Sequence, residues 1–454
     1  MPPSTRRQLL LSGVACVAGA AGAGWGASAA HAQSPTLPRG TEAEARAAVV
    51  ELLRSVVSDV ERPLTGISVA WLHGDNRVSR AWAGWRHIGA DHPEGSLAID
   101  GQTLFRIASV SKLALALAML RLHDARLMDL DDDLSGLLRL AFRHPGFPQT
   151  PITPRLLLSH RSGLLDAATL PFADGAALRH TLAQPGSWGA EEPGRMFRYS
   201  NLGSVVLATA MEAAARQTFA DLMQRWLFDP LGMSCRYRPA ALTPPQRAQL
   251  ATLYRRPDRS PGWVPQFDQR ADVLGTQPEP AGLQLIGDNA SLHSPQGGLR
   301  CSVTDLSRLT RLLMQEGRWE GRRLLSTDSW AQLLRPHWQL APDAPGETAG
   351  GLFRSWGLGL QRFTDTFDAR GGDRLVPRGG VMAYGHLGSA YGLLSGLLFH
   401  PPQGRRPAWG LVYVINGSSQ GAAESPGQYS SLRRSEERVV ESLLDILAPT
   451  REPT

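Results

Sequence analysis

Ser109 and Lys112 stand three positions apart and offer a nucleophile and a base. Lys112 is the only lysine in the 454-residue chain, which otherwise uses 46 arginines as its basic side chains. Arginine stays charged at any working pH, whereas a buried lysine can lose its proton and act as a base. A serine hydroxyl needs such a base to become a strong nucleophile. Residues three apart share one face of a helix, so a helix that begins here would bring the two together. The same pattern is also compatible with one surface lysine near a helix start.

A second group of polar residues, Tyr199 and Asn201, lies in a loop just before an expected helix. The Tyr199 phenol can shuttle a proton if a neighbouring cation lowers its pKa. The Asn201 amide both donates and accepts hydrogen bonds. Taken alone, the segment also fits an ordinary capping loop.

A third group occupies residues 384–392, where glycines surround His386 at the start of an apolar strand. A glycine in a strand allows another backbone or a ligand to approach closely. A backbone amide on such a strand edge can supply half of an oxyanion hole. The alternative is a glycine-rich turn with a structural histidine.

Ser-x-x-Lys, Tyr-x-Asn and His-x-Gly follow one another in the order of the class C β-lactamase family, which also contains DD-peptidases and esterases. Three further segments are similar to that family, and the resemblance extends over residues 45–447. These segments are residues 152–164 (ITPRLLLSHRSGL), 230–233 (PLGM) and 297–306 (GGLRCSVTDL).

The resemblance implies roles for individual residues. Ser109 would be the nucleophile, and Lys112 and Tyr199 would share the base and acid work. The backbone amides of Ser109 and Ser389 would bind the oxyanion. The implied substrate-binding residues are Asn201, His386, Gly388 and Ser389.

His386 departs from the β-lactamases of the family, which have lysine at this position. Histidine there is found in family peptidases and esterases. The resemblance therefore implies an acyl-enzyme hydrolase on Ser109 with esterase or D-amino-acid peptidase activity. The alternatives are a β-lactamase or an inactive relative that binds cell-wall fragments or peptides. We expect a small-molecule ester, peptide or β-lactam as substrate, and neither a metal nor another cofactor, since the histidines show no metal-ligand spacing.

Hydrophobic periodicity predicts an α+β fold, in which an antiparallel sheet is flanked by helices and carries an inserted helical lobe. We expect strands at residues 66–72, 78–85, 357–361, 392–400 and 409–415, and a buried helix over residues 113–120. The predicted catalytic domain spans residues 33–447. Its α/β lobe would comprise about 41–128 and 290–447, and its helical lobe about 129–289. Residues 238–296 show little periodicity, which fits either a cleft wall or a surface excursion.

The first 32 residues are typical of an export signal. A twin-arginine-like start, Arg6-Arg7, precedes an Ala- and Gly-rich stretch and an A-x-A cleavage site that ends at Ala32. We therefore expect a periplasmic or secreted protein. A lipoprotein anchor on Cys16 is a weaker alternative.

No apolar run after residue 32 is long enough to span a membrane. The net charge of +6 over this length indicates no dense basic stripe, so nucleic acid is not expected as a partner. Cys235 and Cys301 remain after signal removal and can pair in an oxidising compartment, although their spacing does not prove it.

A rival nucleophile motif, G-x-S-x-G, occurs at residues 417–421. The α/β-hydrolase fold requires a histidine after this serine in the chain. The last histidine is His400, so the motif is predicted to be a simple turn.

Overall fold

The computed structural model describes residues 42–257, 262–266, 281–341, 344–419, 421, 424 and 426–447. The predicted export signal and Cys16 lie outside these residues. Within the described parts of the chain, no helix is long and apolar enough to cross a membrane.

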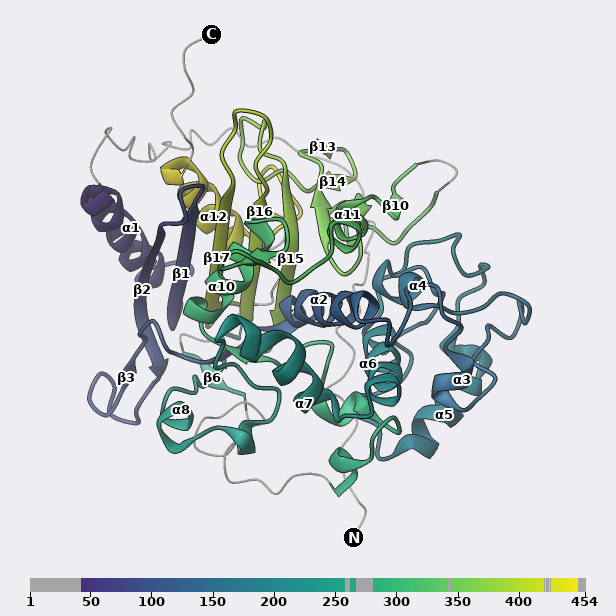
Figure 1. The fold of residues 1–454 in the computed structure, drawn as a ribbon. Coiled ribbons are helices and arrows are strands. Elements are labelled where there is room, and N and C mark those ends of the chain that lie inside the picture. Colours follow the sequence, from purple (N-terminus) through teal and green to yellow (C-terminus); the bar gives the residue numbers. More distant parts are fainter. Residues whose placement is uncertain are drawn as a thin grey trace, which may run out of the picture.

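The centre of the molecule is one antiparallel sheet of nine strands (Figure 1). In chain order these are β1 (Gly66–His73), β2 (Val78–His87), β3 (Leu97–Ala98), β10 (Trp338–Gln339), β11 (Ser355–Trp356), β12 (Gln361–Phe363), β15 (Ala383–Ala390), β16 (Leu393–His400) and β17 (Trp409–Asn416). Their order across the sheet is β10-β11-β12-β15-β16-β17-β1-β2-β3. β1 pairs with β17 over its whole length, so the early and late parts of the chain build one sheet, as the sequence predicted.

Helices cover both faces of this sheet and fill the middle of the chain. They are α1 (Glu42–Val57), α2 (Ser111–Asp124), α3 (Ser135–Leu138), α4 (Pro154–Leu158), α5 (Gly175–Ala183), α6 (Asn201–Ala215), α7 (Phe219–Met223), α8 (Pro244–Ala248), α10 (Val303–Met314), α11 (Thr327–Leu334) and α12 (Arg434–Leu447). A π-helical turn, η3 (Gln224–Phe228), continues α7. Short 3-10 helices are η1 (Ala108–Val110), η2 (Pro185–Ser187), η4 (Asp229–Leu231), η5 (Pro239–Ala241), η7 (Ala281–Gln284) and η8 (Ala290–His293).

Short two-stranded ribbons complete the fold. They are β4 (Phe105–Arg106) with β7 (Arg300–Cys301), β5 (Tyr254–Arg255) with β6 (Val264–Pro265), β8 (Arg318–Trp319) with β9 (Arg322–Arg323), and β13 (Phe367–Asp368) with β14 (Gly371–Gly372).

The two faces of the sheet bury different helices. Alternate residues of a strand point to opposite faces. Thus Val69 and Trp71 of β1 pack with α1 and α12, whereas Ala70 and Leu72 belong to the cluster that contains α2 and α10. Figure 1 shows α1 and α12 on one side of the sheet and α10 on the other. The face that carries α2 is the one that positions the candidate site.

Helix α2 is buried on nearly every side. Every residue from Ser111 to Leu120 is buried, together with Leu122. It contacts α6, α7 and α11 as well as β15. An apolar helix enclosed in this way is held rigidly, and it begins two residues after Ser109.

The predicted strand at residues 357–361 is wrong. β11 ends at Trp356 and β12 begins at Gln361, so residues 357–360 form the turn between them. Gly359 adopts a φ of 69°, which favours glycine, and its amide donates to the Leu158 carbonyl (2.8 Å). A Cβ on Gly359 would lie 2.4 Å from the Ala116 Cβ. The glycines here provide close packing on α2 rather than extended backbone.

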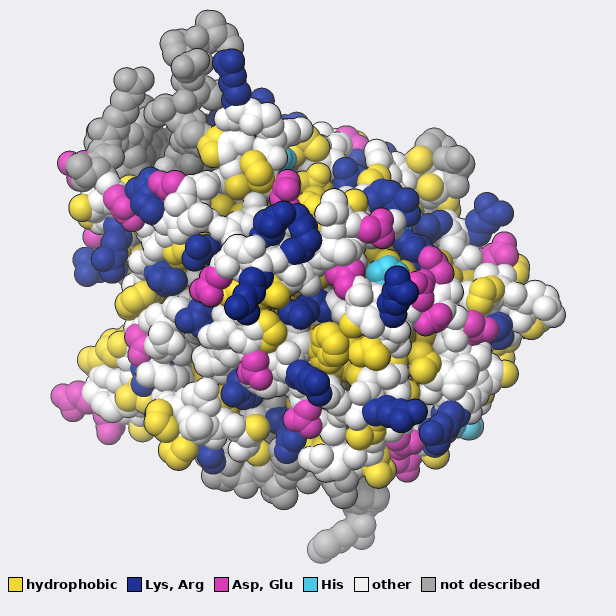
Figure 2. Space-filling model, viewed as in Figure 1, with side chains coloured by type: hydrophobic (Ala, Val, Ile, Leu, Met, Phe, Trp, Pro, Cys, Tyr) yellow, Lys and Arg dark blue, Asp and Glu magenta, His cyan; other side chains and the backbone are white. Residues whose placement is uncertain are grey.

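Charged side chains are intermingled on the surface. In the view of Figure 2, arginines and acidic side chains alternate across this face without forming a stripe of one sign. This distribution agrees with the modest net charge of the chain.

Candidate active site

Ser109 lies in η1, a tight turn that joins β4 to α2. The preceding residue, Ala108, has a φ of 48°, a left-handed conformation that costs about 1–2 kcal/mol for a residue other than glycine. The surroundings offset this strain. Ser111 Oγ donates to the Ala108 carbonyl (2.7 Å), and the Ile107 amide donates to the Leu299 carbonyl (2.9 Å). Strain held in place this way is typical of a functional turn.

Three oxygen atoms surround the ammonium group of Lys112. Its Nζ lies 3.1 Å from Ser109 Oγ, 2.8 Å from Asn201 Oδ1 and 2.8 Å from the Gln296 carbonyl oxygen. A charged amine can donate one hydrogen bond to each of them. A neutral amine keeps two N–H donors. These serve Asn201 Oδ1 and the Gln296 carbonyl oxygen, because both oxygens can only accept. Its lone pair is then directed at the Ser109 hydroxyl.

Burial shifts the proton affinity of this amine. The Lys112 side chain is 2 % exposed, and desolvation lowers its pKa to about 7, with Asp166 acting in the opposite direction. A pKa in this range makes the neutral form of Lys112 accessible near neutral pH. Both protonation states find hydrogen-bond partners in the same geometry.

Tyr199 lies beside both Ser109 and Lys112. Its phenol is hydrogen-bonded to Ser109, and burial raises its pKa above the ordinary value despite that bond. Its ring centre lies 4.3 Å from that of His160 and 5.4 Å from that of Phe353, and the Lys112 Nζ is 4.9 Å from its centre. The phenol is thus protonated at neutral pH and can donate a proton but is a poor base.

Asp166 holds the polar residues at the start of α6, a role that the sequence analysis did not predict. Its carboxylate accepts from the backbone amides of Asn201 (2.7 Å) and Leu202 (2.9 Å) and from Ser200 Oγ (3.1 Å). It also accepts from Asn201 Nδ2 (2.7 Å). Because that bond fixes the side-chain amide, Asn201 Oδ1 must face Lys112.

The backbone of β15 lies against the nucleophile turn. Among the described residues, β12 pairs only with residues 383–385 of β15, so the second half of β15 presents an open edge to η1. A Cβ on Gly388 would lie 3.0 Å from the Ser109 amide nitrogen and 2.8 Å from the Ile107 carbonyl oxygen. Ser389 follows directly and is exposed. The β15 backbone at Gly388 therefore lies directly against the Ser109 amide.

His386 is near these residues but is closed off from solvent. Its side chain is 2 % exposed, and its Nδ1 lies 2.6 Å from the Leu387 carbonyl oxygen. Burial, and then the nearby Lys112, lower its pKa to about 3, so the imidazole is neutral at neutral pH. Its ring packs against Trp356, with 5.4 Å between ring centres. Among the described residues, its Nε2 has no hydrogen-bond partner.

The structure therefore brings together Ser109, Lys112, Tyr199, Asn201 and the 388–389 backbone. Asp166 and the Gln296 carbonyl complete the group and were not found from the sequence. His386 lies next to this group but is buried rather than exposed to solvent. Cys235 and Cys301 are buried next to Asp305 and are not among the contacts of Lys112 and Ser109 given above.

The antiparallel sheet, the serine at the start of a buried helix and the adjacent lysine together define a serine hydrolase. A sequence model of the family described as Beta-lactamase matches residues 46–429. The chain belongs to this family, and it is a serine hydrolase.

Curated relatives include penicillin-binding proteins and a peptidase. Penicillin-binding protein 4 of Amycolatopsis lactamdurans is 26% identical over 329 residues, covering 70% of this chain and 74% of that protein. Penicillin-binding protein 4* of Bacillus subtilis is 33% identical over 140 residues, 29% of this chain and 30% of that protein. The D-alanyl-D-alanine-carboxypeptidase/endopeptidase AmpH of Escherichia coli K12 is 27% identical over 238 residues, 50% of this chain and 56% of AmpH. The chain thus spans about a third to a half of the last two proteins.

Solved structures confirm the predicted fold class. The D-amino acid amidase of Ochrobactrum anthropi SV3 has a TM-score of 0.61 at 18% identity and covers 89% of this chain and 98% of its own. A β-lactamase/D-alanine carboxypeptidase from Yersinia pestis has a TM-score of 0.59 at 17% identity. The match covers 90% of this chain and 100% of the Yersinia protein. At these identities the likeness concerns the fold.

Replacing Gly388 by alanine tests the contact between β15 and the serine turn. The added methyl would lie 2.4 Å from Ser395 Oγ and within 3.0 Å of the Ile107 and Ser109 backbone, so the turn must shift. We expect kcat/KM for an activated ester to fall by roughly 10–100-fold, because small misplacements of reacting groups are costly. Gly136→Ala is the matched control, since nothing lies within 4 Å of a Cβ there. Equal activity of the two variants would contradict this placement.

Proposed function

We propose that the chain is an exported hydrolase that forms an acyl-enzyme on Ser109 and acts as an esterase or D-amino-acid peptidase. The observation that carries the proposal is the contact between Lys112 and Ser109. A buried amine with a pKa of about 7 lies within hydrogen-bond distance of a serine hydroxyl on a strained turn. Burying an amine is unfavourable unless it is hydrogen-bonded, so its burial beside a serine hydroxyl favours a chemical role.

Lys112, rather than Tyr199, is the general base in this proposal. Burial lowers the pKa of the lysine toward the working pH and raises that of the tyrosine away from it. The best general base has a pKa near the working pH. Tyr199, protonated and bonded to Ser109, is suited to pass a proton to the leaving group.

The reaction would proceed in two steps. Ser109 Oγ attacks the substrate carbonyl carbon while Lys112 Nζ takes the hydroxyl proton. The amides of Ser109 and Ser389 stabilise the negative oxygen, and the leaving group departs with a proton relayed through Lys112 and Tyr199. Water, activated by the same base, then attacks the ester carbonyl and releases the acid.

Substrate preference follows from the missing cation on β15. His386 is neutral and buried, so this strand offers no fixed positive charge to the carboxylate of a β-lactam. This favours esters and D-amino-acid amides or peptides over β-lactams. Curated AmpH carries D-alanyl-D-alanine-carboxypeptidase in its name, and the Ochrobactrum protein is a D-amino acid amidase, which supports the peptidase branch.

The site of action in the proposal is the periplasm or the exterior. It rests on the Arg6-Arg7 pair and the cleavage site ending at Ala32. The domain limits, 33–447 with an inserted lobe at about 129–289, are part of the same proposal.

A substrate panel with Ser109→Ala tests this function. We expect the chain to hydrolyse a short-chain nitrophenyl ester or a D-alanyl amide with a higher kcat/KM than a chromogenic cephalosporin. Ser109→Ala should lower these rates by roughly 10³-fold or more, because nothing else replaces the nucleophile. Intact mass after mixing with a penicillin should show an adduct that Ser109→Ala lacks.

Ser419→Ala is the matched control for this panel, since Ser419 is the serine of the rival G-x-S-x-G motif, three residues after the end of β17. It should keep nearly full activity. Loss of turnover in Ser419→Ala but not in Ser109→Ala would overturn the assignment. Faster cephalosporin than ester turnover would refute the substrate preference while leaving Ser109 in its role.

Replacing Asp166 by asparagine tests how the base is tuned. The Asp166 charge raises the pKa of Lys112, so its removal should lower that pKa. The reaction needs neutral Lys112, which accumulates as pH rises, and the acid limb of kcat/KM should therefore move to lower pH. We expect a shift of roughly 0.3–1 unit, because Asp166 is exposed and screened by solvent.

Asp174→Asn is the matched control for this measurement. Asp174 also accepts a backbone amide at a helix start, from Ala177 at α5 (2.8 Å), and is not part of the group around Lys112. For Asp174→Asn, the acid limb of the pH profile of kcat/KM should coincide with that of the unmodified chain. An unchanged or upward-shifted limb in Asp166→Asn would contradict the role given to Asp166.

A further inference from the structure

Cys235 and Cys301 lie opposite each other in a short stretch of antiparallel backbone. Arg236 and Arg300 exchange both of their backbone hydrogen bonds, with N···O distances of 3.0 and 2.9 Å. In an antiparallel pair, the residues next to such a hydrogen-bonded pair form a non-hydrogen-bonded pair whose Cα atoms lie about 4.5 Å apart. Cys235 and Cys301 occupy this position. A disulfide requires a Cα separation of about 4.4–6.8 Å, which the position meets.

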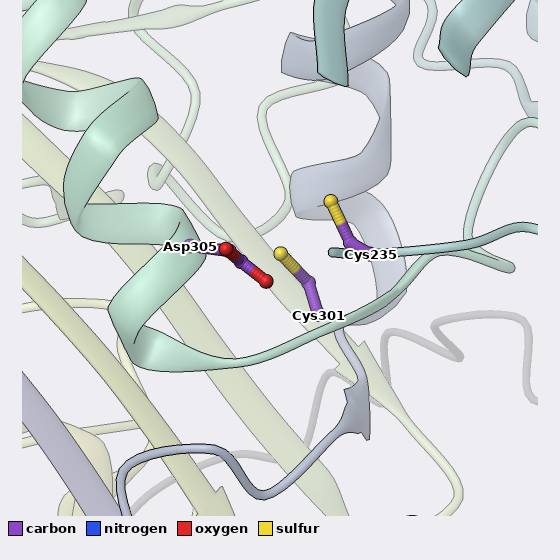
Figure 3. A group of neighbouring side chains, drawn as sticks. All are labelled: Cys235, Cys301 and Asp305. Carbon is purple, nitrogen blue, oxygen red and sulfur yellow. The ribbon is translucent and has the colours of Figure 1, made fainter. Parts of the chain in front are cut away.

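Both cysteines are free thiols in the structure and are fully buried. Their sulfur atoms and a carboxylate oxygen of Asp305 all lie within 4.8 Å of one another. Figure 3 shows the two cysteines on adjacent backbone segments and the Asp305 side chain pointing toward Cys301. The two sulfur atoms are therefore neighbours that are not bonded in the structure.

We propose that Cys235 and Cys301 form a cross-strand disulfide when the chain folds under oxidising conditions. In this step the two thiols lose two protons and two electrons, and one S–S bond forms. A disulfide oxidant, such as oxidised glutathione, takes up the two electrons and two protons and is thereby reduced to two thiols. The proposal is independent of the hydrolase function.

The bond would secure the segment that supports the candidate active site. Cys301 lies in β7, where it is paired with Phe105 of β4, and β4 leads into the turn that carries Ser109. The same segment supplies the Gln296 carbonyl that accepts from Lys112 (2.8 Å). A disulfide at Cys301 would therefore join three neighbouring backbone segments beside the site.

A metal ion is the competing explanation of this cluster. The Asp305 carboxylate, however, already accepts from Ser234 Oγ (2.8 Å) and from the Arg308 guanidinium (3.0 Å). The described residues provide three ligands with suitable spacing here, whereas structural zinc takes four. Burial also raises the pKa of both thiols, which disfavours the thiolates that a metal needs. The observations therefore favour the disulfide.

Buried thiols react slowly in a folded chain, so the experiment forms the bond during folding. The reduced, denatured chain is refolded with a mixture of reduced and oxidised glutathione, and remaining thiols are then alkylated in denaturant. Peptide mapping should recover Cys235 and Cys301 as one linked peptide that reductant separates. Recovery of both as alkylated peptides, or linkage of either to Cys16, would overturn the proposal.

Two further measurements complete the test. The oxidised chain should lose roughly 5 °C of Tm on reduction in denaturant followed by refolding without oxidant, because the cross-link restricts the unfolded chain. The Tm of the double variant Cys235→Ala, Cys301→Ala should not depend on reduction. If this variant does not fold, the peptide map of the unmodified chain still tests the proposal. Refolding with zinc and without oxidant should leave no bound zinc after gel filtration. One equivalent of retained zinc with both thiols protected from alkylation would instead establish a metal site.

Discussion

The burial of a single amine is the constraint on which the rest of this structure depends. Lys112 is enclosed with 2 % of its side chain exposed, and an isolated charge in such a place is strongly disfavoured. The chain accommodates it with three oxygen acceptors, at 2.8 to 3.1 Å, one from the preceding turn and two from distant parts of the sequence. The two distant acceptors must arrive by tertiary folding, so the amine joins η1, α6 and the segment before β7 at one place.

The elements around Lys112 hold this amine and the η1 turn in position. Helix α2 is apolar on all sides and buried, which fixes both Lys112 and the turn before it. The Ser395 hydroxyl of β16 donates to the Ile107 carbonyl (2.7 Å), so the sheet holds the other side of the turn. Gly388 allows β15 to approach this backbone more closely than any side chain would permit. The strained Ala108 conformation persists because these contacts over-determine it.

Residues whose roles depend on side-chain identity could be predicted from the sequence, and those whose roles depend on placement could not. Ser109, Lys112, Tyr199 and Asn201 stand in recognisable motifs, and the structure brings them together. The Gln296 carbonyl could not be found, because every residue has one. Asp166 stands 35 residues before Asn201, and only the fold shows that it accepts from the start of α6. The strand predicted at residues 357–361 failed because its glycines serve packing on α2.

The sole lysine allows the central claim to be measured directly. In protein labelled with ¹³C and ¹⁵N only in lysine, all side-chain signals come from Lys112, and the chemical shift of its Cε can be followed with pH. Lys112→Arg, which lacks the signal, identifies it. The account predicts a titration with a midpoint near 7. A resonance that stays in the charged form to pH values near the ordinary lysine pKa of about 10.4 would contradict Lys112 as the base.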